Sequence, residues 1–250
     1  VALPMDVLDA DCTEEVRPTS FPDTRVAPTA DAVSRAAALL ANAARPLVIM
    51  GDGVAFSGGQ TELTRVAELL GAAVWGANSS EVNIDADHPL FRGQLGHMFG
   101  EHSKSITAEA DAVLIVGTYV FPEVFPVLDG AFAPDARIVH VDLDAYEIAK
   151  NHPVDIGLVA DPKTTLGLLA DELERILGAA ERQAAEQRLT GLEQQKRKEL
   201  ETAHAQDREH WRDTHFQVEG PVVAEMQGAF TDNWTAVNGH VLHGPAYFPP

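Results

Sequence analysis

Short apolar segments alternate with longer amphipathic ones through the middle of the chain. Five of them have the length of strands, and several are apolar at nearly every position: residues 46–50, 72–76, 112–117, 137–144 and 156–161. Strands that are apolar on both faces are typical of a parallel sheet with helices on each side. Because helical segments alternate with them, we expect βαβ units with right-handed crossovers. The pattern predicts the α/β class, as a Rossmann-like doubly wound parallel sheet with helices on both faces.

The segments between the strands carry apolar residues at helical spacing. Four helices are predicted from this spacing, at residues 30–44, 60–70, 101–110 and 161–177. Asp31 is a candidate N-cap of the first helix, and Gly71 a candidate C-cap of the second. Residues 78–100 have little periodicity, and we expect a long loop there.

The flanks of this regular region differ from it in composition. Residues 1–29 begin with an apolar run that contains Pro4 and continue as a polar linker, which predicts the end of a preceding domain. The central domain is expected at residues 30–178. Residues 179–250 predict a polar linker helix and then the start of a following domain. Neither end reads as a natural boundary, so we expect a part of a longer protein.

The charge of the chain narrows the classes of partner. The 250 residues carry a formal net charge of −20, which disfavours nucleic acid and anionic membrane surfaces. The one cysteine, Cys12, cannot form an internal disulfide, and with no secretory signal this predicts a cytoplasmic protein. The acidic residues beside Cys12 would raise the pKa of its thiol, which argues against a nucleophile.

A glycine-rich turn, GDGVAFSGG at residues 51–59, connects a strand to a helix. In doubly wound sheets this turn often contacts phosphate, because glycine lets the backbone approach and the helix directs N–H groups at an anion. Gly51, Gly53, Ser57 and Gly58 are therefore candidate binding residues. The spacing is not G-x-G-x-x-G, so simple turn chemistry remains the alternative.

Other candidate binding residues follow the later strands. Asp142 could accept hydrogen bonds from a ribose or cap a local turn, and both readings stay open. Asp144 is predicted as the N-cap of a helix at AYEIAK. Gly96 lies in a long glycine-bearing loop of the kind that often binds ligands, and Asp161, at the end of the last strand segment, is also a candidate.

Clustered catalytic or metal-binding residues are not evident in the sequence. The ten histidines include the close pairs 97/102 and 240/243, but none has a third ligand at metal spacing. No nucleophile elbow, P-loop or Cys/His dyad is present. We expect no catalytic residue and no metal ligand in this chain.

The order of the segments resembles the central part of thiamine-diphosphate-dependent enzymes such as acetolactate synthase, benzoylformate decarboxylase and oxalyl-CoA decarboxylase. The resemblance covers residues 1–177 and is carried, in order, by ARPLVIMGDGVAFSGG, DHPLFRGQLG, ADAVLIVGTYV, ARIVHVDLDAYEIAKN and IGLVADPKTTL. It implies a three-domain parent that uses thiamine diphosphate and Mg²⁺ and forms a dimer or tetramer. The central domain would have the other domains of the same enzyme as its partners.

The same resemblance bears on a nucleotide in this domain. Members that bind FAD have a motif similar to G-x-R-F-D-D-R, whereas Gly117 here begins GTYVFPE, without either arginine. This disfavours FAD or an ADP moiety, although Gly117 remains a candidate, and Val120–Phe121 is more similar to benzoylformate decarboxylase. The GDG at residues 51–53 is not the family's metal motif, because no Asn-Asn pair follows it.

Three interpretations result. The first is the central domain of a thiamine-diphosphate-dependent 2-oxo-acid decarboxylase or carboligase, a lyase or transferase, with a structural or vestigial nucleotide site and no activity of its own. The second is a free-standing module that binds FAD, NAD or an ADP-containing coenzyme. The third is an interaction scaffold whose contact is the polar helix after Gly178.

Overall fold

The computed structural model describes residues 23–77, 79–96, 101–120 and 130–210, together with residues 15, 17, 18 and 20. Within 101–102 and 203–210 only the backbone is described. The chain divides into two units, Val1–Leu200 and Glu201–Pro250, and the sheet belongs to the first. Several predicted segments lie outside the described residues: the apolar run that contains Pro4, Cys12, the segment around Phe121, and residues 211–250, where the start of a following domain is expected. Among the described helices, none combines the length and apolar character needed to cross a bilayer.

The centre of the first unit is a six-stranded sheet in which every neighbouring pair is parallel. The spatial order is β3-β2-β1-β4-β5-β6. This is the order of a doubly wound dinucleotide-binding sheet, so the predicted fold class is confirmed. The strands are β1 (Pro46–Met50), β2 (Ala73–Gly76), β3 (Phe91–Gln94), β4 (Ala112–Val116), β5 (Arg137–Asp142) and β6 (Ile156–Val159).

Strand β3 is a sheet edge that the sequence pattern did not predict. It has four residues, three half-buried and one exposed, and it includes Arg92 and Gly93. Such a segment has neither an apolar run nor clean alternation, so it lacks the signal by which strands are recognised. The loop predicted at residues 78–100 therefore contains a strand, β3, in addition to the five strands that were predicted.

Six helices are described in the first unit, of which the last continues past Leu200. They are α2 (Ala30–Ala41), α3 (Gly53–Ser57), α4 (Gln60–Leu70), α5 (Glu101–Thr107), α6 (Pro162–Ile176) and α7 (Ala179–His210). Gly71 ends α4 in a left-handed conformation with φ of 57°, which confirms the predicted C-cap. The short helix α3 lies inside the glycine-rich turn and was not expected.

Two predicted helix caps are wrong. The N-cap of α2 is Thr29, whose Oγ1 accepts the N–H of Ala32, whereas Asp31 lies in the first turn and pairs with Arg35 four residues on. Asp144 begins no helix; its Oδ1 accepts the N–H of Tyr146 at 2.9 Å and closes a turn. Both cases reflect the preference of Thr and Asp side chains for nearby backbone N–H groups, which caps and turns satisfy equally.

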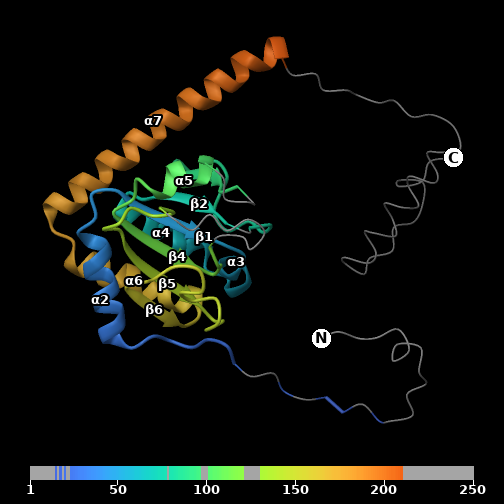
Figure 1. Ribbon diagram of the computed structural model, residues 1–250, viewed down its shortest axis with the longest axis vertical. Helices are drawn as coiled ribbons and strands as arrows, with labels where there is room; N and C mark the ends of the chain where they lie inside the picture. Colours follow the sequence, from blue (N-terminus) through green and yellow to red (C-terminus); the bar gives the residue numbers. More distant parts are fainter. Residues whose placement is uncertain are drawn as a thin grey trace, which may run out of the picture. The chain divides into compact units, whose positions relative to one another are not determined.

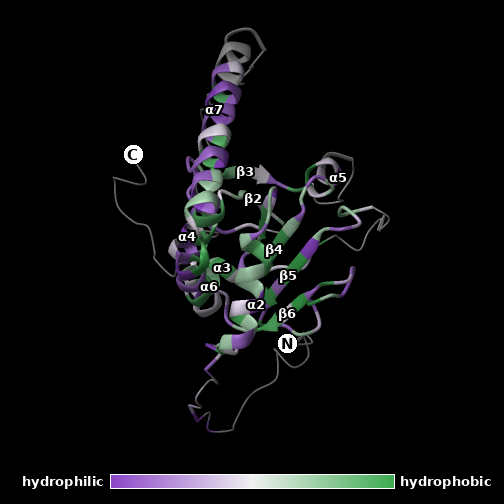
Figure 2. Ribbon diagram, turned by 90° about the vertical axis from the view of Figure 1, so that its left-hand side faces the viewer, coloured by the Kyte–Doolittle hydropathy of each residue, from purple (hydrophilic) through white to green (hydrophobic). Residues whose placement is uncertain are grey.

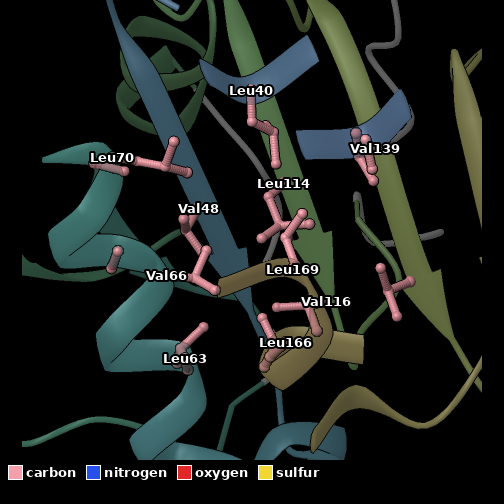
Figure 3. Packing of buried hydrophobic residues seen from close by; sticks show 14 of the residues in the cluster. Leu40, Val48, Leu63, Val66, Leu70, Leu114, Val116, Val139, Leu166 and Leu169 are labelled. Carbon is pink, nitrogen blue, oxygen red and sulfur yellow. The ribbon is translucent and has the colours of Figure 1, made fainter. Parts of the chain in front are cut away.

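The larger of the two cores lies between the sheet and helices α2, α4 and α6 (Figure 1). Figure 3 shows its centre, where Leu63 and Val66 of α4 face Val48 of β1, and Leu114 of β4 lies near Leu169 of α6. The central strands β1 and β4 are buried at all five positions. Burial on both faces explains why their sequences are continuous apolar runs.

The opposite face of the sheet has a smaller core. Leu47, Ile49, Val113 and Ile115 contribute to it, and Ile106 of α5 packs against it. Helices are thus found on both faces, as predicted, but they are distributed unequally.

Helix α7 is mostly hydrophilic, as Figure 2 shows, yet its first half is attached to the sheet domain. Ala185 is buried, and Arg188 donates from Nε and Nη2 to the carbonyl oxygen of Leu70. Lys196 donates to the carbonyl oxygens of Ala86 and His88. The predicted polar helix therefore packs by directing cationic side chains at backbone carbonyl oxygens, one at the end of α4 and two in the segment between β2 and β3.

Candidate functional site

The carboxyl edge of the sheet is the candidate site, because ligands of doubly wound sheets bind where the strand order reverses. Here that point lies between β1 and β4, which are neighbours although β2 and β3 lie between them in the sequence. Gly51 and Gly53 follow β1, and Gly117 follows β4. The structure thus brings three of the predicted site residues together.

These three glycines contact one another and leave no space for a ligand between them. The N–H of Gly53 donates to the carbonyl oxygen of Gly117 at 3.0 Å. A Cβ on Gly53 would lie 2.7 Å from Cα of Gly117, and a Cβ on Gly117 would lie 2.7 Å from the nitrogen of Val54. Glycine is required here because two backbone segments pack against each other, as the turn-chemistry alternative expects; contact of these residues with a phosphate stays a prediction.

Thr118 closes the edge above β1. Its Oγ1 donates to the carbonyl oxygen of Ala77 at 2.9 Å, so a residue that follows β4 reaches the end of β2 across the end of β1. A Cβ on Gly51 would overlap the side chain of Thr118 and would lie 2.8 Å from the carbonyl oxygen of Gly117. Because Gly51 has no side chain, the side chain of Thr118 can pass over the end of β1 and reach Ala77.

The side chain of Asp52 places a carboxylate at this edge of the sheet. Its carboxylate accepts the N–H groups of Ser80 and Glu81, each at 2.9 Å, and the hydroxyl of Ser80. Nδ2 of Asn83 adds a longer bond of 3.3 Å. Burial acts to raise the pKa of Asp52, but the hydrogen bonds together outweigh it and lower the pKa. The carboxylate is therefore ionised at neutral pH, and it would repel a phosphate.

The N–H groups that begin α3 are also occupied. Gly53 donates to Gly117, Val54 donates to the carbonyl oxygen of Gly51, and Ala55 donates to Oδ1 of Asn83 at 2.9 Å. A phosphate at a helix N-terminus needs these donors free. An FAD or ADP diphosphate therefore cannot be held by the first N–H groups of α3 in this arrangement.

We predict that Asp52→Asn lowers the free energy of unfolding at pH 7 by about 1 kcal/mol, because an amide accepts the N–H groups less strongly than a carboxylate. The native pKa of Asp52 is lowered, so its contribution is complete above the unfolded value near 3.8 and is lost as pH falls through the native pKa. Urea unfolding of both proteins from pH 7 downward measures this. A difference that stays constant at low pH would contradict the assigned role.

The remaining predicted residues along this edge have structural roles. Oγ of Ser57 donates to the carbonyl oxygen of Val54 at the end of α3, and Gly58 is the left-handed C-cap of that helix. Asp161 is buried and caps α6, accepting both the N–H and the hydroxyl of Thr164. The N–H of Gly96 donates to Oγ of Ser103 at 2.7 Å. None of the four lies within the contact formed by the three glycines.

Asp142 ends β5 beside a buried histidine that the sequence did not single out. Its Oδ1 accepts the N–H of Asp144 at 2.8 Å, which is the capping alternative; a contact to ribose stays a prediction. Burial raises the pKa of Asp142. Nε2 of His140 donates to the carbonyl oxygen of Thr118 at 2.9 Å, and its Nδ1 has no partner among the described residues. The histidine helps to hold Thr118 in place.

A second histidine, His152, gives the stability a dependence on pH. Burial, and after it the nearby His140, lower the pKa of His152 to about 4, and burial lowers that of His140. Since unfolded histidine titrates near 6.5, the unfolded chain binds more protons below that pH, and native stability is lost as pH falls from 6.5 towards 4. His152 lies against the ring of Phe132, with ring centroids 4.9 Å apart. We predict that His152→Phe, which keeps an aromatic ring but cannot be protonated, reduces this loss. Thermal unfolding at pH 7.5, 6 and 5 tests it, and an unchanged slope would contradict it.

The edge offers no metal site in the described part of the chain, where no group of three or more His, Cys, Asp or Glu residues could hold an ion.

Asp52, Asn83 and Thr118 were not among the residues predicted from the sequence. Asp52 stood within the glycine-rich turn, but its partners lie 28–31 residues away and give no local signal. Histidines 97, 240 and 243 lie outside the described residues.

Comparison with known families decides what this domain is. Residues 33–169 match the family described as thiamine pyrophosphate enzyme, central domain. The chain belongs to this family. The resemblance inferred from the order of segments is thereby confirmed, and the central-domain match coincides with the sheet and the helices α2 to α6.

Relatives of this central domain are considerably longer proteins. The chain is 34% identical over 134 residues to the probable acetolactate synthase large subunit of Methanocaldococcus jannaschii, covering 54% of the chain and 22% of the relative. It is 33% identical over 141 residues to sulfoacetaldehyde acetyltransferase of Rhodobacter capsulatus, covering 55% and 24%. The chain thus spans about a quarter of the length of these relatives.

A solved structure has the same fold. Benzoylformate decarboxylase from Polynucleobacter necessarius superimposes with a TM-score of 0.54 and is 27% identical, covering 64% of this chain and 30% of that one. The homology to acetolactate synthase, sulfoacetaldehyde acetyltransferase and benzoylformate decarboxylase is distant.

Proposed function

We propose that this chain is the structural central domain of a thiamine-diphosphate-dependent enzyme that decarboxylates or ligates 2-oxo acids. The acetolactate synthase and benzoylformate decarboxylase relatives support this class of reaction. In the parent, bound thiamine diphosphate would supply a nucleophilic carbon and an electron sink for the 2-oxo acid. In this proposal the described part of the domain contributes no catalytic group.

One observation carries the structural assignment. The position that a nucleotide diphosphate takes in a doubly wound sheet is filled by the protein's own groups: the contact of Gly53 with Gly117, the crossing by Thr118 and the carboxylate of Asp52. An apolar core on both faces of the sheet makes this domain a rigid support. Its partners are the other domains of the same enzyme, within a homo-oligomer.

The proposal is tested on the polypeptide that carries this domain in its natural context. With thiamine diphosphate, Mg²⁺ and a panel of 2-oxo acids, we expect release of carbon dioxide, and none from the 250-residue chain alone. Turnover by the 250-residue chain alone would overturn the structural role, and a parent without activity that depends on thiamine diphosphate would overturn the reaction class. Lyase activity that requires added FAD would favour the nucleotide-binding alternative.

A further inference from the structure

A groove of about 610 Å³ lies at the opposite end of the sheet from the carboxyl edge. Its floor is made by Leu47 of β1 and by Ala73 and Trp75 of β2, its walls by Ile106 of α5 and Leu192 of α7. Volumes of this size accommodate small organic ligands, which usually bind in apolar clefts that contain few polar groups. The groove belongs to the first unit alone and shares no residue with the closed carboxyl edge.

Gly191 of α7 is an exposed residue at this groove. It lines the groove in the interior of a long helix, and a Cβ built on it would have no atom within 4 Å. A glycine inside a helix costs about 1 kcal/mol relative to alanine, and here close packing does not require it. Its neighbours Leu189 and Leu192 pack against the large core. The smallest residue of this helix therefore lies where a side chain would fill free space.

The polar groups of the groove are predominantly cationic. Arg45, Arg92 and Arg188 line it together with a single acid, Glu109, in a chain whose formal net charge is −20. Positive charge concentrated in a cleft of an acidic protein attracts anions locally. This sign is opposite to that of the carboxyl edge, where Asp52 is ionised.

Two of the arginines are oriented by backbone carbonyl oxygens. Arg188 donates to the carbonyl oxygen of Leu70 at 2.7 Å, and Arg45 donates from Nε to that of Glu109. Neither forms an ion pair with a described residue, whereas the surface residue Arg65 pairs with two carboxylates. The nearby Asp111 uses its oxygens for the backbone N–H groups of residues 44 and 45.

Burial also affects the charged groups. It lowers the pKa of Arg188, because the guanidinium has lost part of its hydration, while the negative charge of Asp111 acts in the opposite direction. The side chain of Arg92 is only 7% exposed; its Nη2 binds Glu199, and its Nη1 has no partner among the described residues. A guanidinium is suited to binding a carboxylate through two parallel hydrogen bonds.

We infer that the groove between α5 and α7 binds a small amphipathic organic anion, an apolar ring or chain that carries a carboxylate. The apolar body lies on Trp75 between Ile106 and Leu192, and the carboxylate lies towards Arg188 and Arg45. The site is independent of the proposed function, because it uses none of the residues at the carboxyl edge. A ligand here would connect α7 to the sheet.

The experiment uses 1-naphthoate as the probe and 1-naphthalenemethanol as its uncharged counterpart. Calorimetric titration of the chain is expected to give a dissociation constant of about 0.1 mM for the anion and tenfold weaker binding for the alcohol. In ¹⁵N spectra the indole N–H of Trp75 and the amide of Gly191 are expected to shift.

Three variants separate the groove from other sites. Gly191→Leu fills the free space while improving helix propensity, and it should weaken naphthoate binding at least tenfold. Arg45→Gln removes one charge from an exposed side chain and should weaken the anion about threefold without affecting the alcohol. Arg175→Gln, on the surface of α6, is the matched control and should change neither. Absence of binding, or equal affinity in the Gly191→Leu variant with an unchanged unfolding curve, would overturn the inference.

Discussion

Replacement of Gly117 by alanine is expected to destabilise the domain by about 3 kcal/mol. Gly117 has φ of 65°, a left-handed conformation that costs other residues about 1–2 kcal/mol. The added Cβ would also lie 2.7 Å from the nitrogen of Val54, and backbone atoms at this distance must move apart. Because Gly53 and Gly117 hold the ends of β1 and β4 together, the displacement would disturb the bond between them. Urea unfolding followed by circular dichroism measures the change.

The matched control for this variant is Gly167→Ala. Gly167 lies inside α6, and the nearest atom to its Cβ would be Cγ of Glu62 at 3.8 Å, an ordinary contact. The control is expected to stabilise the domain by about 0.5–1 kcal/mol, because alanine is the better helix former. If both variants changed stability alike, the glycine contact at the carboxyl edge would not be the tight packing described above.

A second large effect is expected for Leu114→Ala, with a loss of about 3 kcal/mol. Leu114 is fully buried at the centre of β4, and Figure 3 shows it near Leu169 of α6 and Leu40 of α2. Truncation loses the transfer free energy of the removed atoms and leaves a cavity between rigid elements. Chemical denaturation at neutral pH gives the value.

Leu168→Ala is the corresponding control, because Leu168 is 40% exposed on the outer face of the same helix that supplies Leu169. Its effect should stay within about 0.5 kcal/mol, as for other surface positions. A loss at Leu168 as large as that at Leu114 would mean that α6 is covered by something beyond the described residues.

Most of the fold could be predicted because the signal for each strand or helix lies within its own short segment of sequence. Strands β1 and β4 are buried on both faces, so their sequences are unbroken apolar runs, and α4 has a regular apolar stripe closed by Gly71. Strand β3 could not be predicted in this way, since an edge strand with Arg92 and Gly93 carries no periodic signal. The family resemblance was predictable from the order of the segments.

The chemistry of the site was less predictable, because it depends on contacts between distant segments. Glycines at 51, 53 and 117 are compatible both with a phosphate and with close packing of two backbones. The deciding contacts are those of Thr118 with Ala77 and of Asp52 with the segment that contains Ser80 and Asn83. These pairs are separated by about 30–40 residues, and only the folded sheet brings them together.

The central claim is that the protein's own groups close the nucleotide position at the carboxyl edge. The most direct measurement is calorimetric titration of the 250-residue chain with FAD and, separately, with ADP, together with the amide spectra of Gly51, Gly53 and Gly117. We predict no binding of either up to about 1 mM and no shift of the three glycine resonances. Micromolar binding accompanied by shifts of these resonances would show that the edge opens for a nucleotide, and it would contradict the account.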